Sequence, residues 1–241
     1  MSQTDRFTGR ADVYEAGRPS YPPAALDALF DGLGDPARLV VADLGAGTGI
    51  STRILAARGA QVLAVEPNAA MRAKAAPDPR VRWIDGTAEA TTLPDGSVDV
   101  AAAFQAWHWF DHAIALRELH RVVRPAGRIA VLYNERDERD PFTAALGDIF
   151  RRYATEPTEA LRADALARFA ALPGATYHTF GNTQELDRDG IHARLASSSY
   201  VPHEGDAAAA MHAEGDALFD RFAVDGQVRI HLATLLAIAP P

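Results

Sequence analysis

The stretch VVADLGAGTG, residues 40–49, decides the fold of this chain. An apolar, β-branched run ends at Leu44, and glycines follow as Gly45, Gly47 and Gly49. A short apolar run without polar alternation is typical of a strand buried on both faces of a parallel sheet. Glycines permit a tight turn and a close approach of the backbone to a ligand, and the amides of a following helix face that ligand. The stretch therefore predicts a ligand-binding strand–turn–helix unit.

Strand-like runs alternate with helical patterns on either side of this stretch. Strands are predicted at residues 39–44, 61–65, 81–84, 98–104 and 128–133. Helical spacing of apolar residues lies between them, at residues 48–58, 68–76 and 112–123. This repeated alternation predicts a doubly wound, Rossmann-like α/β fold with a mainly parallel sheet.

The second half of the chain is less regular. Helices are predicted at residues 142–153, 159–172, 189–195 and 206–222, and strands at residues 176–180 and 228–236. The last two strands would complete a seven-stranded sheet with an antiparallel edge strand, and the extra helices a helical lid. We expect a single domain over residues 1–241, made of an N-terminal lid segment (1–35), a cofactor-binding core (36–135) and a substrate-side C-terminal half (136–241).

Composition excludes several kinds of chemistry. The 241 residues include no cysteine, which excludes disulfides, thiolate metal sites and a cysteine nucleophile. The histidines are scattered without metal-ligand spacing, so no metal is predicted. A net charge of −8 argues against a nucleic-acid partner. Residues 1–10 lack an apolar stretch, so we expect a cytoplasmic protein with no membrane partner. We also expect either a monomer or a homodimer.

The glycine spacing and one acidic residue narrow the ligand. Gly45, Gly47 and Gly49 are one residue short of the dinucleotide pattern G-x-G-x-x-G. Glu66 ends the second predicted strand, 17 residues beyond Gly49, where a carboxylate accepts hydrogen bonds from ribose hydroxyls. Alone, a strand-end glutamate is as often merely solvated, but together the two features favour a nucleoside-containing ligand.

Four ordered motifs carry a resemblance to a known family. They are DLGAGTG at residues 43–49, EPNAAM at 66–71, DGTAE at 85–89 followed by LPDGSVD at 93–99, and RPAGR at 124–128. In this combination the chain resembles the class I S-adenosylmethionine (SAM)-dependent methyltransferases, in particular the type 11 and trans-aconitate methyltransferase-like small-molecule group. The resemblance implies SAM as the cofactor.

The resemblance also implies which residues bind SAM. The cofactor-binding residues of the core would be Asp43, Gly45, Ala46, Gly47, Gly49, Glu66, Pro67, Met71, Thr87, Ala88, Glu89 and Gln105. Met71 would pack against adenine. Many relatives carry an aspartate where this chain has Thr87; the threonine hydroxyl, the backbone of Ala88 or the nearby Asp85 would then accept from the adenine amino group.

The stretch FQAWHWFD, residues 104–111, follows the fourth predicted strand, and ligands bind at the carboxyl ends of such strands. By resemblance Gln105 lies near the methionine part of SAM, whereas Trp107, His108 and Trp109 face the methyl acceptor. His108 is the candidate general base, since an unperturbed histidine has a pKa near neutrality. The alternative is that the tryptophans pack and His108 is a hydrogen-bonded part of the wall.

The N-terminal stretch YEAGRPSYP, residues 14–22, resembles a segment that folds over the cofactor as a lid. Arg18 would pair with the methionine carboxylate of SAM, and Tyr14 and Tyr21 would close the pocket, Tyr14 on the cofactor side and Tyr21 on the substrate side. The alternative is a surface segment that merely docks on the domain.

These patterns predict an enzyme that moves the SAM methyl group to an oxygen, of a carboxylate or hydroxyl, or to a nitrogen of a small molecule. Arg136 and Arg194 are candidates for holding an anionic acceptor. Three alternatives stay open: a non-catalytic SAM-binding protein, a protein-modifying methyltransferase and, because several nucleotide-binding families share a glycine-rich turn, an NAD-dependent oxidoreductase.

Overall fold

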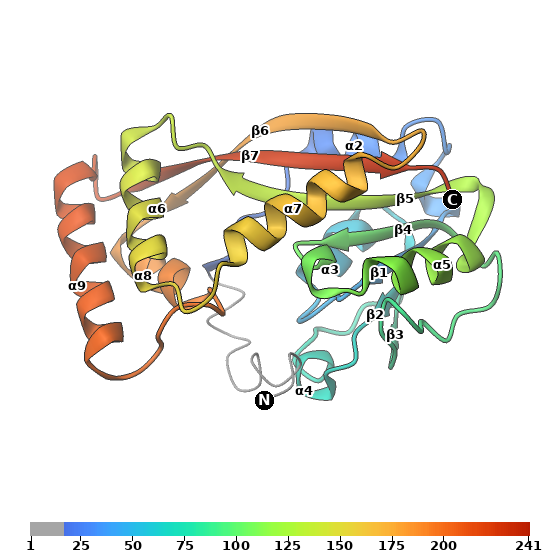
Figure 1. Cartoon of the computed structure of the whole chain (residues 1–241), viewed down its shortest axis with the longest axis horizontal. Coiled ribbons are helices and arrows are strands. Elements are labelled where there is room, and N and C mark those ends of the chain that lie inside the picture. The colour runs from blue at the N-terminus through green and yellow to red at the C-terminus, as the bar shows by residue number, and fades with distance from the viewer. Residues whose placement is uncertain (1–16) are drawn as a thin grey trace.

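A computed structural model describes residues 17–241 of the chain (Figure 1). Its first half contains the strands β1 (Val40–Leu44), β2 (Gln61–Val65), β3 (Val81–Ile84), β4 (Val98–Phe104) and β5 (Val123–Arg136). The helices of this half are α2 (Pro23–Phe30), η2 (Pro36–Arg38), α3 (Ile50–Ala57), α4 (Ala69–Arg72), η3 (Trp107–Trp109) and α5 (His112–Val122). The second half contains α6 (Pro141–Tyr153), α7 (Thr158–Ala170), β6 (Thr176–Leu186), α8 (Arg188–Ala196), α9 (Gly205–Phe222) and β7 (Val228–Ala239).

These strands form one seven-stranded sheet in the order β3-β2-β1-β4-β5-β7-β6. The strands β1 to β5 are parallel, whereas β7 is antiparallel to both of its neighbours, β5 and β6. The predicted doubly wound, mainly parallel sheet is confirmed, with the antiparallel strand lying one place inside the edge. The strand order reverses between β1 and β4, and sheets of this kind bind ligands at that switch point.

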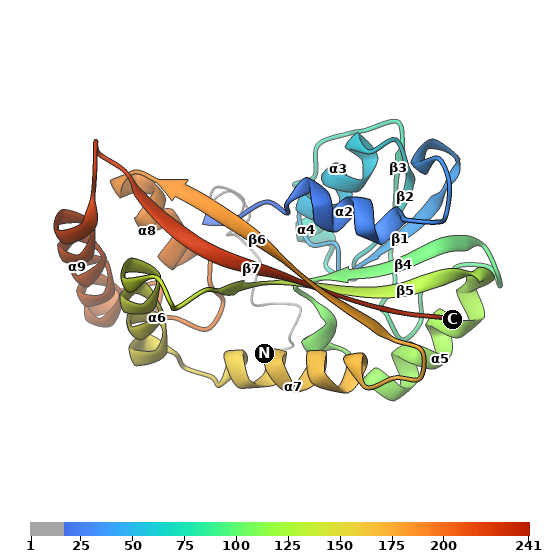
Figure 2. The ribbon, with the colours of Figure 1, turned by 90° about the horizontal axis from the view of Figure 1, so that it is seen from above.

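Helices cover both faces of the sheet, as Figure 2 shows. On one face Leu29 of α2 and Leu55 of α3 are fully buried against Val100 of β4. On the other face Leu119 of α5 and Phe169 of α7 are buried in a second cluster. The α/β part of the chain is therefore a three-layer sandwich that holds the carboxyl ends of the parallel strands at one rim.

The predicted N-terminal lid segment needs a correction. Its residues 1–16 lie outside the described part of the chain. Residues 23–30 form α2, which buries Leu26 and Leu29 on the sheet and so belongs to the core rather than to a lid. Residues 17–22, which we call the strap, cross the rim of the sheet, where the side-chain amides of Asn134 and Asn182 donate to the carbonyl of Ser20 at 3.1 and 2.7 Å.

The helices α6, α8 and α9 form a second unit, which we call the helical lobe (Figure 1). They share a third buried cluster that includes Leu146, Ile191 and Met211. Aspartates are the N-caps of two of these helices: Asp140 accepts from the amide of Thr143, and Asp187 from that of Gly190. The strands β5, β7 and β6 extend from the sheet to this lobe and connect it to the α/β part.

Several predicted boundaries are wrong for identifiable reasons. The strands β6 and β7 run to Leu186 and Ala239 because they pair with each other along their whole length, from Thr176 opposite Ile238 onward. The helix expected at residues 68–76 ends at Arg72, and β5 continues three residues beyond Tyr133. The prediction of a single domain over residues 1–241 stays a prediction.

Candidate functional site

The glycine-rich loop between β1 and α3 is fixed to the end of β2. The amides of Gly45 and Ala46 donate to the carbonyl of Val65 at 2.9 and 3.2 Å. Gly45 has a φ of +66°, and a Cβ added there would lie 2.9 Å from that of Ala106. The loop therefore requires glycine here both for its backbone conformation and for its close approach to the neighbouring segment.

Asp43 lies beneath this loop and is fully buried. One carboxylate oxygen accepts from the hydroxyls of Ser51 and Thr52 at 2.8 and 2.5 Å. Burial raises the pKa of Asp43 to about 6, against the lowering effect of the two hydroxyls, and the charge of Glu66 raises it further. Asp43 thus holds the start of α3 in place, and its contact with the cofactor stays a prediction.

Glu66 directly follows β2 at the rim of the sheet, with 8% of its surface exposed. Its two oxygens accept from the amides of Gly47 and Asn68 at 3.0 and 2.8 Å. Burial raises the pKa of Glu66, although these hydrogen bonds and the charge of Arg72 act in the opposite direction. The carboxylate is therefore oriented by backbone donors and lies where ribose hydroxyls are bound in sheets of this type.

Two adjoining pockets open at this rim. The first, which we call the nucleoside pocket, is lined by most of the predicted cofactor residues: Gly45, Gly47, Glu66, Pro67, Met71, Thr87, Glu89 and Gln105. Trp109, which was predicted to face the methyl acceptor, also lines this pocket. Two predicted residues, Gly49 and Ala88, are instead buried behind its wall. Gly49 begins α3, and a Cβ there would lie 3.1 Å from the ring of Trp83.

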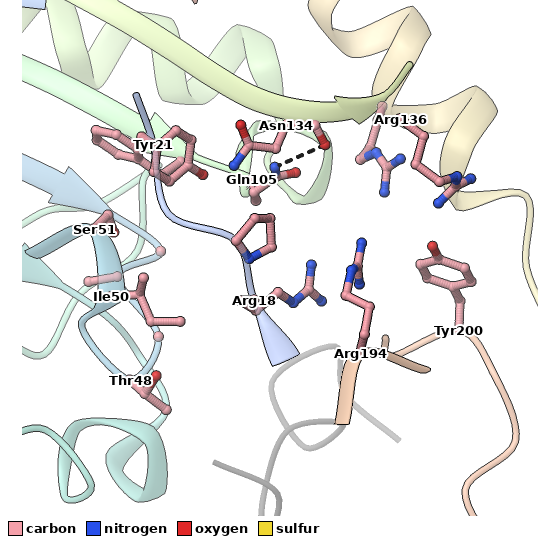
Figure 3. Close-up of a pocket in the computed structure, with 16 residues that line it drawn as sticks. Arg18, Tyr21, Thr48, Ile50, Ser51, Gln105, Asn134, Arg136, Arg194 and Tyr200 are labelled. Atoms are coloured by element: carbon pink, nitrogen blue, oxygen red, sulfur yellow. Dashed lines mark hydrogen bonds between the residues drawn. The ribbon is translucent and has the colours of Figure 1, made fainter. Parts of the chain in front are cut away.

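The second pocket, which we call the arginine pocket, lies between the glycine loop and the helical lobe (Figure 3). Gly45, Gly47 and Gln105 line both pockets, so the two are continuous. Four arginines line the far side together with two other polar residues: Arg18, Arg136, Arg162, Arg194, Asn134 and Tyr200. Sequence reasoning missed Asn134, Arg162 and Tyr200, which come from three separate elements and share no local motif.

Gln105 lies where the two pockets meet. Its φ is +58°, which is rare for a residue with a side chain and is retained mainly at functional sites. Its amide donates to the carbonyl of Leu132 at 2.9 Å, which holds the end of β4 against β5. Gln105 thus lines both pockets, and its contact with the methionine part of SAM stays a prediction.

His108 of η3 is hydrogen-bonded to Tyr133 through both its backbone and its ring. The Tyr133 hydroxyl accepts from the His108 amide at 3.0 Å and lies 3.0 Å from Nδ1 of the ring. Since the buried Tyr133 hydroxyl already accepts from the amide, we assign its own proton to Nδ1, which places the ring proton on Nε2. Burial lowers the pKa of His108 to about 3, and the nearby charges of Arg162 and Arg18 lower it further.

This arrangement changes the chemical interpretation of His108. The prediction of a general base assumed a pKa near neutrality, and that assumption is wrong in this structure. At neutral pH the ring is uncharged, weakly basic and presents an N–H donor at Nε2. His108 lines a small cavity beside the arginine pocket together with Trp109 and Arg162, so it is placed to donate a hydrogen bond to a bound molecule.

Of the other predicted side chains, one lines the arginine pocket and one lies in the hydrophobic core. Tyr21 lines the arginine pocket and packs edge-on against Phe104, with ring centroids 5.0 Å apart. Trp107 is only 1% exposed and packs against Phe169, so its predicted substrate contact is wrong and it is a core residue. Tyr14 lies outside the described residues.

Arg18 comes from the strap and reaches the helical lobe. One of its guanidinium nitrogens donates to the carbonyl of Ser197 at 2.9 Å. In Figure 3 its side chain points into the arginine pocket toward Arg194. Within residues 17–241 no group of three or more histidine, aspartate or glutamate side chains is placed to hold a metal ion. Over the same range no helix has the length and apolar character needed to cross a membrane.

Comparison with known sequences identifies related proteins. Residues 42–131 match a family described as a methyltransferase domain. An uncharacterized methyltransferase of Mycobacterium tuberculosis is 46% identical over 147 residues, which is 61% of this chain and 59% of that protein. An uncharacterized methyltransferase of Geobacillus kaustophilus is 31% identical over 59% of this chain and 71% of its own length. The match thus spans about three fifths of the mycobacterial relative.

Solved structures show the same fold along nearly the whole chain. A putative type II methyltransferase from Anaeromyxobacter dehalogenans has a TM-score of 0.71 and 27% identity, and the match covers 92% of this chain and 97% of that one. A SAM-dependent methyltransferase from Geobacter sulfurreducens, solved with S-adenosyl-L-homocysteine, has a TM-score of 0.53 and 19% identity over 96% and 98% of the two chains.

Proposed function

This chain belongs to the class I SAM-dependent methyltransferase family, and from this premise we propose that it moves the methyl group of SAM to an oxygen or nitrogen of a small molecule. The observation that carries the proposal is the continuity of the two pockets through Gly45, Gly47 and Gln105. SAM alone would fill the nucleoside pocket and reach only Arg18 in the arginine pocket. The rest of the arginine pocket, a polar wall lined by Asn134, Arg162, Arg194 and Tyr200, supports the presence of an acceptor.

The residues of the nucleoside pocket fit SAM. Gly45 and Gly47 line the pocket without side chains and with positive φ angles, and the loop amides precede a helix N-terminus. Glu66 would hold the ribose hydroxyls, and Met71 would form the apolar wall beside adenine. Arg18, which lines the adjoining pocket, would pair with the methionine carboxylate.

SAM supplies an electrophilic methyl group on a positively charged sulfur when it is bound. The chain then has to position the acceptor in line with that methyl group and exclude water. The strap supports this task, because Asn134 and Asn182 both hold it across the rim, and its own Tyr21 packs against Phe104. The low pKa of His108 favours an acceptor that is nucleophilic without losing a proton, such as a carboxylate or a neutral amine.

Binding and turnover test the proposal separately. Thermal unfolding of the chain is measured with SAM, with S-adenosylhomocysteine and with NADH, since a ligand that binds the folded state raises the melting temperature. Labelled SAM is then incubated with pools of carboxylic acids, phenols and amines. We expect stabilisation by SAM and S-adenosylhomocysteine but not by NADH, and transfer of label to one of the pools.

Each alternative gives a different result. Stabilisation by NADH alone would indicate an oxidoreductase and contradict the proposal. Stabilisation by SAM without release of S-adenosylhomocysteine for any pool would indicate a non-catalytic SAM-binding protein.

A further inference from the structure

The wall of the arginine pocket that faces the glycine loop carries an excess of positive charge. Arg136 and Arg162 approach it from β5 and α7, and Arg194 and Tyr200 from α8 and the segment after it. Figure 3 shows the side chains of Arg136, Arg194 and Tyr200 converging on one space from different elements. The sheet side and the helical lobe together therefore build this wall.

Two of these arginines are neutralised by carboxylates. Arg162 pairs with Glu135 through two hydrogen bonds of 3.0 and 2.9 Å, the geometry expected of a strong bidentate pair. Arg136 pairs with Glu159 and lies 3.4 Å from Glu138. The charges of Arg136 and Arg162 are thus balanced inside the chain.

Arg194 is not balanced in this way. Only 8% of its surface is exposed, yet no ion pair among the described residues gives it a carboxylate, and its Nε has no hydrogen-bond partner there. Its remaining polar contact is a long one, 3.4 Å to the hydroxyl of Ser197, while its guanidinium lies over the ring of Phe150. A buried charge of this kind is costly unless an opposite charge is bound beside it.

Tyr200 supplies a second group at the same place. Its side chain is 5% exposed and lines the pocket beside Arg162. Burial raises the pKa of its hydroxyl, but the charges of Arg162, Arg136 and Arg194 lower it by more, so that the net pKa is below its ordinary value. A hydroxyl in such surroundings is a strong hydrogen-bond donor to an anion.

We propose that Arg194 and Tyr200 bind an oxyanion of the methyl acceptor, a carboxylate or a phosphate group. The inference rests on the proposed function and assigns the class of its substrate. One unbalanced guanidinium calls for one anionic group. The planar fork of arginine suits a carboxylate or phosphate, and the Tyr200 hydroxyl adds a third donor. Arg18 is set apart by its bond to Ser197 and by its predicted partner, the methionine carboxylate of SAM.

Calorimetric titration tests this inference without relying on turnover. Succinate, inorganic phosphate and the neutral succinamide are titrated into the chain saturated with S-adenosylhomocysteine. We expect one of the anions to bind the wild type and succinamide not to bind. Arg194→Gln should weaken that binding by at least about tenfold, since a charged hydrogen-bonding partner is lost. Arg229→Gln, an exposed arginine on β7 paired with Glu185, is the matched control and should leave it unchanged.

A second variant distinguishes a loss of anion binding from a folding defect. Tyr200→Phe keeps the aromatic ring packed near Phe150 and removes only the hydroxyl, so it should also weaken anion binding while the affinity for S-adenosylhomocysteine is retained. Preference for succinate or for phosphate identifies which of the two groups the acceptor carries.

The outcomes distinguish a failure of this substrate assignment from a failure of the proposed function. If S-adenosylhomocysteine does not bind the wild type, the proposed function fails. If S-adenosylhomocysteine binds but neither anion does, or if Arg194→Gln and Tyr200→Phe bind the anion as tightly as the wild type, the substrate assignment is overturned and the proposed function stands.

Discussion

Asp43 couples the cofactor loop to pH, because its carboxyl group is buried and no cation among residues 17–241 pairs with it. Its pKa is raised to about 6 from an ordinary value of 3.8, so folding favours the protonated form. The stability that this group contributes is fully present below pH 3.8 and is lost as the pH rises through 6. By linkage this difference is worth roughly 3 kcal/mol of unfolding free energy.

Asp43→Asn removes that titration. The asparagine oxygen still accepts from Ser51 or Thr52. The stability of the variant relative to the wild type should therefore increase as the pH rises from 4 to 7.5. Urea unfolding at both pH values measures the effect, with the exposed Asp225→Asn as the control for net charge. A wild-type advantage that grows with pH would show that the Asp43 pKa is lowered rather than raised.

His108→Ala tests whether the ring acts as a base or as a hydrogen-bond donor. Since its pKa is about 3, we expect kcat to fall by less than about tenfold and the pH profile between 5.5 and 8.5 to keep its shape. Loss of a true general base costs about 10²- to 10⁴-fold. His120→Ala, on the exposed side of α5, is the matched control. If kcat of His108→Ala fell a hundredfold and its pH profile changed, His108 would be a general base after all.

At the level of single residues, the cofactor side was predictable and the acceptor side was not. The loop glycines and Glu66 follow directly after strands, and the local sequence specifies such positions. Arg162 and Tyr200 lie on elements that meet only in the folded chain, and arginine supplies nearly all the basic residues here, so no single arginine stood out. The pKa of His108 depends on burial against Tyr133, which no sequence pattern reports.

Among the secondary-structure elements, the loop between β1 and α3 gives the sharpest prediction. Gly45→Ala places a methyl group 2.9 Å from Ala106 at a φ of +66°, so the loop must shift. Affinity for S-adenosylhomocysteine should fall more than about tenfold, because the loop amides leave their positions. Calorimetry measures this loss.

Gly96→Ala is the matched control for the backbone effect. Gly96 also has a positive φ, +53°, but open space surrounds the position of its Cβ. The Gly96→Ala variant should lose about 1–2 kcal/mol of unfolding free energy and keep its affinity for S-adenosylhomocysteine. Equal affinities of the two alanine variants would mean that the close approach at Gly45 is not needed for binding.

The helices and strands were predictable where the apolar residues kept one spacing along the whole element. Short β-branched runs gave β1 to β4, and amphipathic spacing gave α5 to α9 within a few residues. The end of β5 was missed because Asn134, Glu135 and Arg136 are polar and resemble a loop. The helix α2 was missed although Pro23 occupies its first position, a start signal that the sequence contained.

Across the whole molecule, the two halves of the site belong to different structural units. We expect S-adenosylhomocysteine to slow hydrogen exchange at the glycine loop and at residues 66–71. An acceptor analogue added afterwards should slow exchange at residues 194–200, because the anion would tie the helical lobe to the sheet. The helix α9, whose residues do not line either pocket, is the internal control. Full protection of residues 194–200 by S-adenosylhomocysteine alone would contradict this division.

The strand β5 alternates its side chains between two tasks as it leaves the sheet. Tyr133 and Glu135 contact His108 and Arg162, whereas Asn134 and Arg136 line the arginine pocket. For enzyme engineering, this makes position 136 the exchangeable one, because Asn134 also holds the strap through Ser20. A directed-evolution library confined to residue 136 should redirect the choice of acceptor while the rest of β5 and the cofactor half are inherited unchanged.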